Sequence, residues 1–172
     1  MAAAVYVASL LLLFGTSAVY HRSRGPRVRP VMRRLDHAMI YLLIAGTYTP
    51  VCLVALPPNW GIPLLVVVAT GAAVGMVLKL VAFRSAGRYA SALYLLLGWV
   101  VFPAGPVLVR VVSPVQLALL FLGGLAYTIG WPVLLFRRPD PWPSIFGYHE
   151  VWHAFTIIAA VFHFAAVASL VT

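Results

Sequence analysis

Long apolar stretches alternate with short polar connections along almost the whole chain. Six of these stretches are close to 20 residues long, and a helix of that length crosses a hydrocarbon core about 30 Å thick, because it rises about 1.5 Å per residue. The pattern therefore predicts an all-α integral membrane helical bundle, a single polytopic domain over residues 1–172. The predicted spanning helices are residues 1–20, 36–56, 61–83, 89–109, 114–136 and 146–172.

The composition agrees with this pattern. Hydrophobic residues make up 63% of the chain and charged residues 9%, and the mean hydropathy of +1.02 lies outside the range of soluble domains. The first stretch lacks the basic n-region of a secretion signal and is too long for an h-region, so we interpret it as a spanning helix. Cys52 is the only cysteine, which excludes a disulfide framework and a CxxC metal site.

The basic residues predict the orientation of the bundle. Of the twelve Lys and Arg residues, Arg110 alone falls in the fourth connection, and the second connection has none. Because short cytoplasmic loops are enriched in Lys and Arg, the first, third and fifth connections should be cytoplasmic, in a protein of the plasma membrane. The formal charge of +9 thus marks orientation and does not indicate nucleic acid. The eleven other basic residues are Arg22, Arg24, Arg27, Arg29, Arg33, Arg34, Lys79, Arg84, Arg88, Arg137 and Arg138.

Both termini then face outward. The chain begins with "MAAAVY" and enters its first helix at once. We therefore expect that a helix preceding Met1 is missing.

Polar side chains meet at one level of the predicted bundle. Ionisable groups inside a membrane are costly, so each is a candidate functional residue. Ser17 and His21 have i, i+4 spacing at the cytoplasmic end of the first helix, and Asp36 starts the second. His149 and His153 have the same spacing at the start of the sixth.

Three imidazoles with an open fourth position are typical of catalytic zinc sites, in which a bound water reaches a pKa of about 7. His21, His149 and His153 are the candidate ligands, and Ser17 and Asp36 could orient that water and accept its proton. Taken singly, Asp36 could instead be a helix N-cap, Ser17 a packing residue and His21 an interfacial side chain.

Residues 149–153 also read HEVWH, the HExxH pattern of zinc proteases, with Glu150 in the place of the base. Glu150 lies near a helix start, however, where the helix dipole favours an acidic residue. We interpret His37 as an interface residue and place Asp140 in a solvated loop. His163 lies about 15 Å from His153 along the helix, too far to share a metal with it.

Three segments, "SAVYH", "LDHAMIYLLIAGTYTP" and "HEVWHAFTIIAAVFHF", give the chain a resemblance to a known family. They resemble the bacterial hemolysin III branch of the progestin and adipoQ receptor family, relatives of the adiponectin receptors and, more distantly, of alkaline ceramidases. The resemblance implies a seven-helix fold, of which six helices are present here. It also implies zinc bound by His21, His149 and His153, with Asp36 and Ser17 around the metal-bound water.

The favoured function is zinc-dependent hydrolysis of a lipid amide or ester, with membrane lipids as partners. A non-enzymatic cytolytic, channel-like or receptor-like protein with a structural zinc is the alternative. An HExxH intramembrane protease is a third hypothesis. Protein partners and oligomeric state do not follow from the sequence.

The orientation can be tested with single cysteines placed at Arg27 and at Asn59. The two positions lie in the first and second connections, so a membrane-impermeant thiol reagent should label them from opposite sides. Labelling of both cysteines from the same side would contradict the predicted topology.

Overall fold

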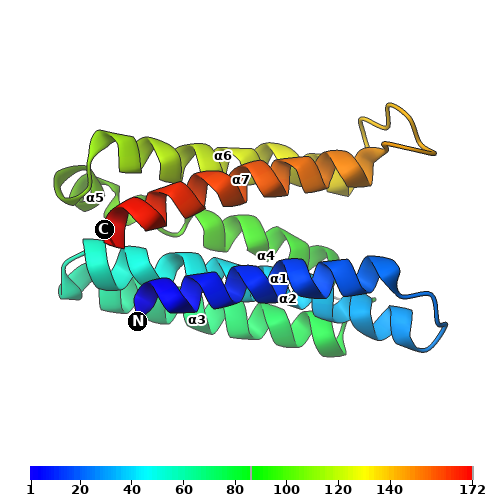
Figure 1. Ribbon diagram of the computed structural model, residues 1–172. Coiled ribbons are helices and arrows are strands. Elements are labelled where there is room, and N and C mark those ends of the chain that lie inside the picture. The colour runs from blue at the N-terminus through cyan, green and yellow to red at the C-terminus, as the bar shows by residue number, and fades with distance from the viewer. Residues whose placement is uncertain (86, 172) are drawn as a thin grey trace. The chain divides into compact units, whose positions relative to one another are not determined.

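The computed structural model describes residues 1–85 and 87–171 of the chain (Figure 1). These residues form helices and one isolated β-bridge, between Trp142 and Phe146, and they contain no strand. Six segments are long and apolar enough to cross a membrane, which confirms the predicted all-helical membrane fold. The elements are α1 (Ala2–Arg22), α2 (Val28–Pro50), the π-helical turn η1 (Val51–Ala55), α3 (Pro58–Val81), α4 (Gly87–Trp99), the 3-10 turn η2 (Phe102–Ala104), α5 (Gly105–Val111), α6 (Pro114–Phe136) and α7 (Tyr148–Val171). Thr172, the last residue of the sixth predicted span, and the side chain of Arg88 lie outside the described part of the chain.

The second helix begins eight residues before its predicted start, at Val28 in place of Asp36. Hydropathy placed the arginine-rich segment in a loop, but arginine is a good helix former and Pro30 falls in the first turn, where proline is tolerated. Asp36 therefore lies about 12 Å along the axis of α2 from Val28. The N-cap residue is Arg27, so Asp36 does not cap this helix.

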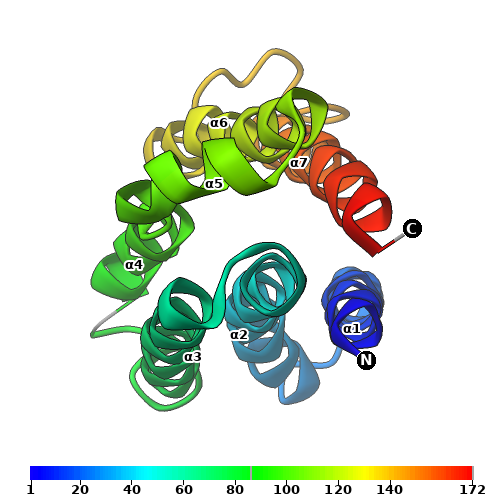
Figure 2. The same cartoon turned by 90° about the vertical axis from the view of Figure 1, so that its left-hand side faces the viewer.

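The chain divides into two units, Met1–Val107 and Leu108–Leu170, with the boundary inside α5. In the first unit α2 packs against both α1 and α3, and α3 packs against α4. Figure 2 views this order along the helix axes. The helix pairs are antiparallel because their connections are short.

Tyrosines of α2 join it to α4 by hydrogen bonds across the first unit. The Tyr41 hydroxyl donates to the carbonyl of Ala90. The Tyr48 hydroxyl donates to the Leu97 carbonyl at 2.9 Å and accepts from the Val101 amide at 3.2 Å. α4 ends at Trp99, shortly before Pro103, and the Leu97 carbonyl also accepts from the Val100 amide at 3.4 Å. Tyr48 therefore adds hydrogen bonds to the backbone where the helix is interrupted.

The second unit contains α6 and α7. Gly130 and Gly123 of α6 provide the space for side chains of α7, since a Cβ at either position would clash with Phe155 or with His163. At one end of this helix pair, the Gln116 side-chain amide donates to the Ser169 carbonyl at 2.8 Å. Small residues thus let these two helices approach closely, as is common between membrane helices.

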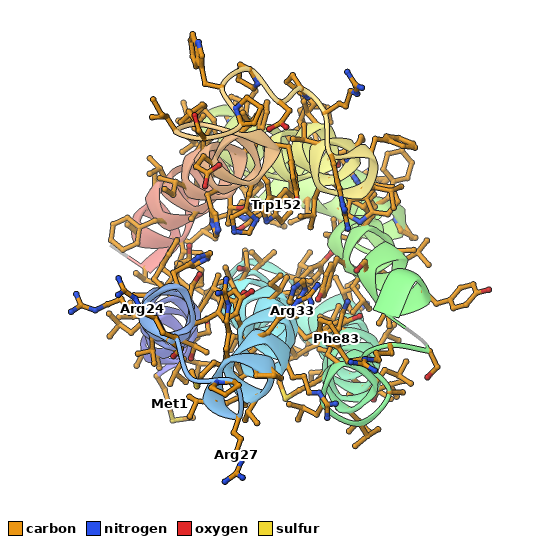
Figure 3. The ribbon with its side chains drawn as sticks, turned by 90° about the vertical axis from the view of Figure 1, so that its right-hand side faces the viewer. Met1, Arg24, Arg27, Arg33, Phe83 and Trp152 are labelled. Atoms are coloured by element: carbon orange, nitrogen blue, oxygen red, sulfur yellow. The ribbon has the colours of Figure 1, made fainter. Side chains whose placement is uncertain are left out.

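Six of the nine basic residues of the first unit lie where α1 ends and α2 begins. Arg24 and Arg27 point away from the helices in Figure 3. The Arg29 guanidinium lies 6.0 Å from the Tyr20 ring centroid, and Arg34 donates to the Leu80 carbonyl at 3.1 Å. Arginines in this region therefore cover helix ends as well as facing solvent.

A tight contact between α2 and α3 gives a test of this packing. A Cβ at Gly75 would lie 2.0 Å from Cζ of Tyr41, a buried ring that its hydrogen bond to Ala90 holds in place. Gly75→Ala should lower the free energy of unfolding by about 1–3 kcal/mol, measured as a drop in the thermal midpoint in detergent. Gly98→Ala is the matched control, because a Cβ there meets nothing within 4 Å. Equal midpoints for the two variants would show that the contact is not tight.

Candidate metal centre

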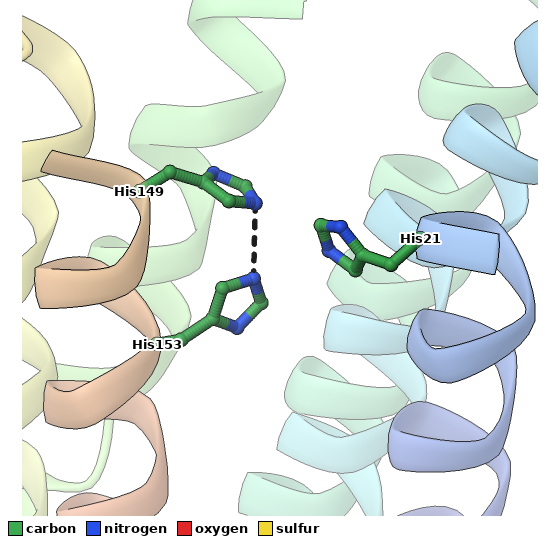
Figure 4. A group of neighbouring side chains, drawn as sticks. All are labelled: His21, His149 and His153. Carbon is green, nitrogen blue, oxygen red and sulfur yellow. Dashed lines mark hydrogen bonds between the residues drawn. The ribbon is translucent and has the colours of Figure 1, made fainter. Parts of the chain in front are cut away.

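His149 and His153 form the centre of the candidate site, in the second unit. They lie one turn apart at the start of α7, so both rings project from one face of the helix. Their Nε2 atoms are 3.0 Å apart and the rings are nearly perpendicular, at 88° (Figure 4). Both side chains are half-buried. The structure thus brings together the two histidines that the sequence predicted as a pair.

This geometry suits two ligands of one metal ion. In a tetrahedral zinc site with Zn–N distances of about 2.0–2.1 Å, two ligand nitrogens lie roughly 3.3 Å apart. At 3.0 Å one Nε2 can carry a hydrogen and donate it to the other. If neither Nε2 atom carries a hydrogen, the two lone pairs face each other and repel unless a cation lies between them. Because 3.0 Å is close to the spacing of two zinc-bound nitrogens, the pair could bind a metal ion without large movement.

Two carboxylates fix the start of α7, one in the connection before the helix and one in its first turn. The Asp140 Oδ1 atom accepts from the Tyr148 amide at 2.9 Å, and the Glu150 Oε2 atom accepts from the Gly147 amide at 2.9 Å. Such bonds satisfy amides that a helix N-terminus leaves unpaired. Glu150 therefore serves the backbone of its own helix start. Asp140 is exposed, as expected for a loop residue, but its capping role was not predicted.

The other predicted site residues belong to the first unit. Ser17 and His21 lie one turn apart on α1, and Asp36 lies on α2, which packs against α1. Ser17 and Asp36 are half-buried, and His21 is exposed. The three are therefore on neighbouring helices, but with Asp36 well inside α2 and not at its first residue.

Three histidines are candidates to hold a metal ion, each through one ring nitrogen: His21, His149 and His153. Two of them belong to the pair on α7. His21 is the candidate third ligand and comes from the other unit. No side chain of the described residues identifies which metal could be bound.

The two remaining histidines make other contacts. His37 packs edge-on against Phe83, with ring centroids 5.1 Å apart. The His163 Nε2 atom lies 3.2 Å from the Leu120 carbonyl of α6. His163 therefore links α6 to α7.

These features define a multi-pass helical membrane protein with histidines that can hold a metal ion. A family model described as haemolysin-III related matches residues 1–164. The hemolysin-3 homolog of Bacillus subtilis (strain 168) is 33% identical over 153 residues, which are 89% of this chain and 69% of the relative. Hemolysin-3 of Bacillus cereus is likewise 33% identical over 153 residues, 89% of this chain and 67% of the relative. The chain belongs to the haemolysin-III related family, which confirms the hemolysin III resemblance.

The histidine pair makes a direct prediction about metal content. His149→Ala and His153→Ala should each lower the bound metal of the purified protein severalfold, because each removes one of two adjacent donors. Metal per chain can be measured by inductively coupled plasma mass spectrometry. His37→Ala is the control and should keep its metal, since His37 packs against Phe83. Full metal occupancy in a His149→Ala/His153→Ala double variant would contradict the assignment.

Proposed function

We propose that this protein is a zinc-dependent hydrolase of a membrane lipid amide or ester. The observation that carries the proposal is the pair of Nε2 atoms on α7, 3.0 Å apart and half-buried in a membrane protein. Histidine-only ligands suit a catalytic zinc better than a structural one, which is usually closed by four ligands and rich in cysteine. The single cysteine, Cys52, is buried after Pro50 in η1, on a different element from every candidate ligand.

His21 is proposed as the third ligand. The order of helices and basic residues along the chain supports this choice. His21 lies in the last turn of α1, next to the arginine-rich connection. His149 lies in the first turn of α7, after the connection that carries Arg137 and Arg138. By the charge rule both connections are cytoplasmic, so the proposal puts the site on the cytoplasmic side, open to lipids of the inner leaflet. His21→Ala should then lower metal content as the other two substitutions do.

The wider resemblance to adiponectin receptors and alkaline ceramidases supports the choice of substrate class. A bound zinc would supply Lewis-acid activation of water and of the substrate carbonyl. Asp36 would accept a proton from water during attack and later return it to the leaving group. The Ser17 hydroxyl, one turn from His21, would donate a hydrogen bond that orients the reacting groups.

The protease hypothesis assigns the base differently, to Glu150. That carboxylate accepts a hydrogen bond from the Gly147 amide, an arrangement that stabilises the helix start. A base that must rotate out of such a bond is poorly suited to proton transfer.

The name of the Bacillus cereus relative, hemolysin-3, favours a second candidate function, membrane lysis without catalysis. The two functions differ in a simple assay. Release of a dye from liposomes, with no lipid product detectable by mass spectrometry, would support lysis and refute the hydrolase.

The hydrolase proposal predicts that removing the charge of Asp36 and removing that of Glu150 change the rate of hydrolysis by unequal amounts. Asp36→Asn should reduce hydrolysis of long-chain lipid amides or esters by about 10²- to 10⁴-fold with zinc still bound, because it removes the general base. Glu150→Gln should keep most of the activity, because a glutamine side-chain oxygen can still accept from the Gly147 amide. The measurement is turnover of a lipid panel by zinc-loaded protein. An inactive Glu150→Gln beside an active Asp36→Asn would instead support the protease.

A further inference from the structure

A cluster of basic and aromatic side chains lies in the first unit, on helices other than those that carry the three histidines. Its centre is Phe83, just after the end of α3. The Arg33 guanidinium of α2 lies 5.0 Å from the Phe83 ring centroid, and the Lys79 ammonium of α3 lies 5.5 Å from it. Figure 3 labels Arg33 and Phe83 on their neighbouring helices. Two cations therefore share one aromatic ring.

The third helix of the cluster, α4, adds a hydroxyl and a second ring. The Lys79 Nζ atom donates to the Ser91 hydroxyl at 2.9 Å and lies 5.3 Å from the Tyr94 ring centroid. The Tyr94 hydroxyl in turn donates to the His37 carbonyl at 2.8 Å, which ties α4 to α2. Three helices thus fix the position of Lys79, which is only 2% exposed.

The charges of the first unit are strongly unequal. Of the twelve Lys and Arg residues, Arg110, Arg137 and Arg138 lie beyond it, which leaves nine, whereas Asp36 is its one carboxylate. Whatever Asp36 contacts, an excess of cations stays at this end of α2 and α3. An anion bound at this end would balance part of that excess.

The surroundings favour a lipid phosphate over a free one. Val28 and Val31 at the start of α2 and Val81 at the end of α3 are each more than half exposed. Apolar side chains beside basic ones, at the end of membrane-spanning helices, suit a ligand with a phosphate and acyl chains. Basic pockets between membrane helices bind lipid headgroups in this way.

We propose that Arg33, Lys79 and Ser91 form a binding site for the headgroup phosphate of an anionic phospholipid. Arg33, which is exposed, meets the phosphate at the surface, and its planar guanidinium can donate two parallel hydrogen bonds. Lys79 and the Ser91 hydroxyl form the inner end of the site, and both cations lie against the Phe83 ring. This site is separate from the histidines and does not depend on the proposed hydrolase.

The test is lipid binding by the full-length chain in detergent, followed by native mass spectrometry during titration with phosphatidylglycerol. Arg33→Gln and Lys79→Met should each weaken binding by about tenfold, because each removes a charged donor. Lys79→Arg, which keeps the charge, should bind within about threefold of the parent chain. Arg24→Gln is the matched control: it loses the same charge from a side chain that points away from the helices, and its binding should stay within about twofold.

Other outcomes would overturn the proposal. If Arg33→Gln and Arg24→Gln bind alike, the basic cluster is only a packing contact; Arg33 is exposed, so this comparison does not depend on whether Lys79→Met folds. Equal binding of phosphatidylcholine, whose choline offsets the phosphate charge, would exclude recognition of an anionic headgroup. Displacement of bound phosphatidylglycerol by millimolar inorganic phosphate would show that a free phosphate is the ligand.

Discussion

The structure depends on one constraint: in a hydrocarbon core, every backbone amide and carbonyl has to find a partner within the protein. Helices meet this demand along most of the chain. The interruption after Trp99 shows how a side chain can provide hydrogen bonds where a helix is broken. There the Tyr48 hydroxyl donates to the Leu97 carbonyl and accepts from the Val101 amide, so a side chain of α2 adds hydrogen bonds to the interrupted backbone. Because that side chain comes from another helix, the interruption also fixes how α2 and α4 pack.

The same constraint divides the polar side chains into two groups. Several serine and threonine hydroxyls donate to a carbonyl three or four residues earlier in their own helix; these are Ser9, Thr47, Thr49, Thr128, Thr156 and Ser169. Histidine and lysine side chains are too long or too directional to pair in this way. They reach other side chains or helices instead, as Lys79 reaches Ser91 and His149 reaches His153. The candidate ligands of both proposed sites therefore belong to the second group.

Hydropathy and spacing alone predicted the six spanning helices and the His149–His153 pair, because both depend on local periodicity. The start of α2 was predicted wrongly, because hydropathy does not distinguish a charged loop from charged helical turns that extend beyond the apolar span. The capping bond of Asp140 and the position of Lys79 were not predicted at all. Each depends on a partner that is eight or more residues away in the sequence and comes close only in the folded chain. The periodicity of the sequence does not identify such a partner. The roles of Ser17, His21 and Asp36 stay predictions.

The early start of α2 also brings two of its charged residues close together. Arg33 and Asp36 are three residues apart on one helix, so their Cβ atoms are neighbours, about 5–6 Å apart. A phosphate held by Arg33 would place a second negative charge close to Asp36, and like charges at this spacing repel. One cation could not offset both anions. Arg33 and Lys79, the two cations that share the Phe83 ring, would balance the two negative charges of such a pair.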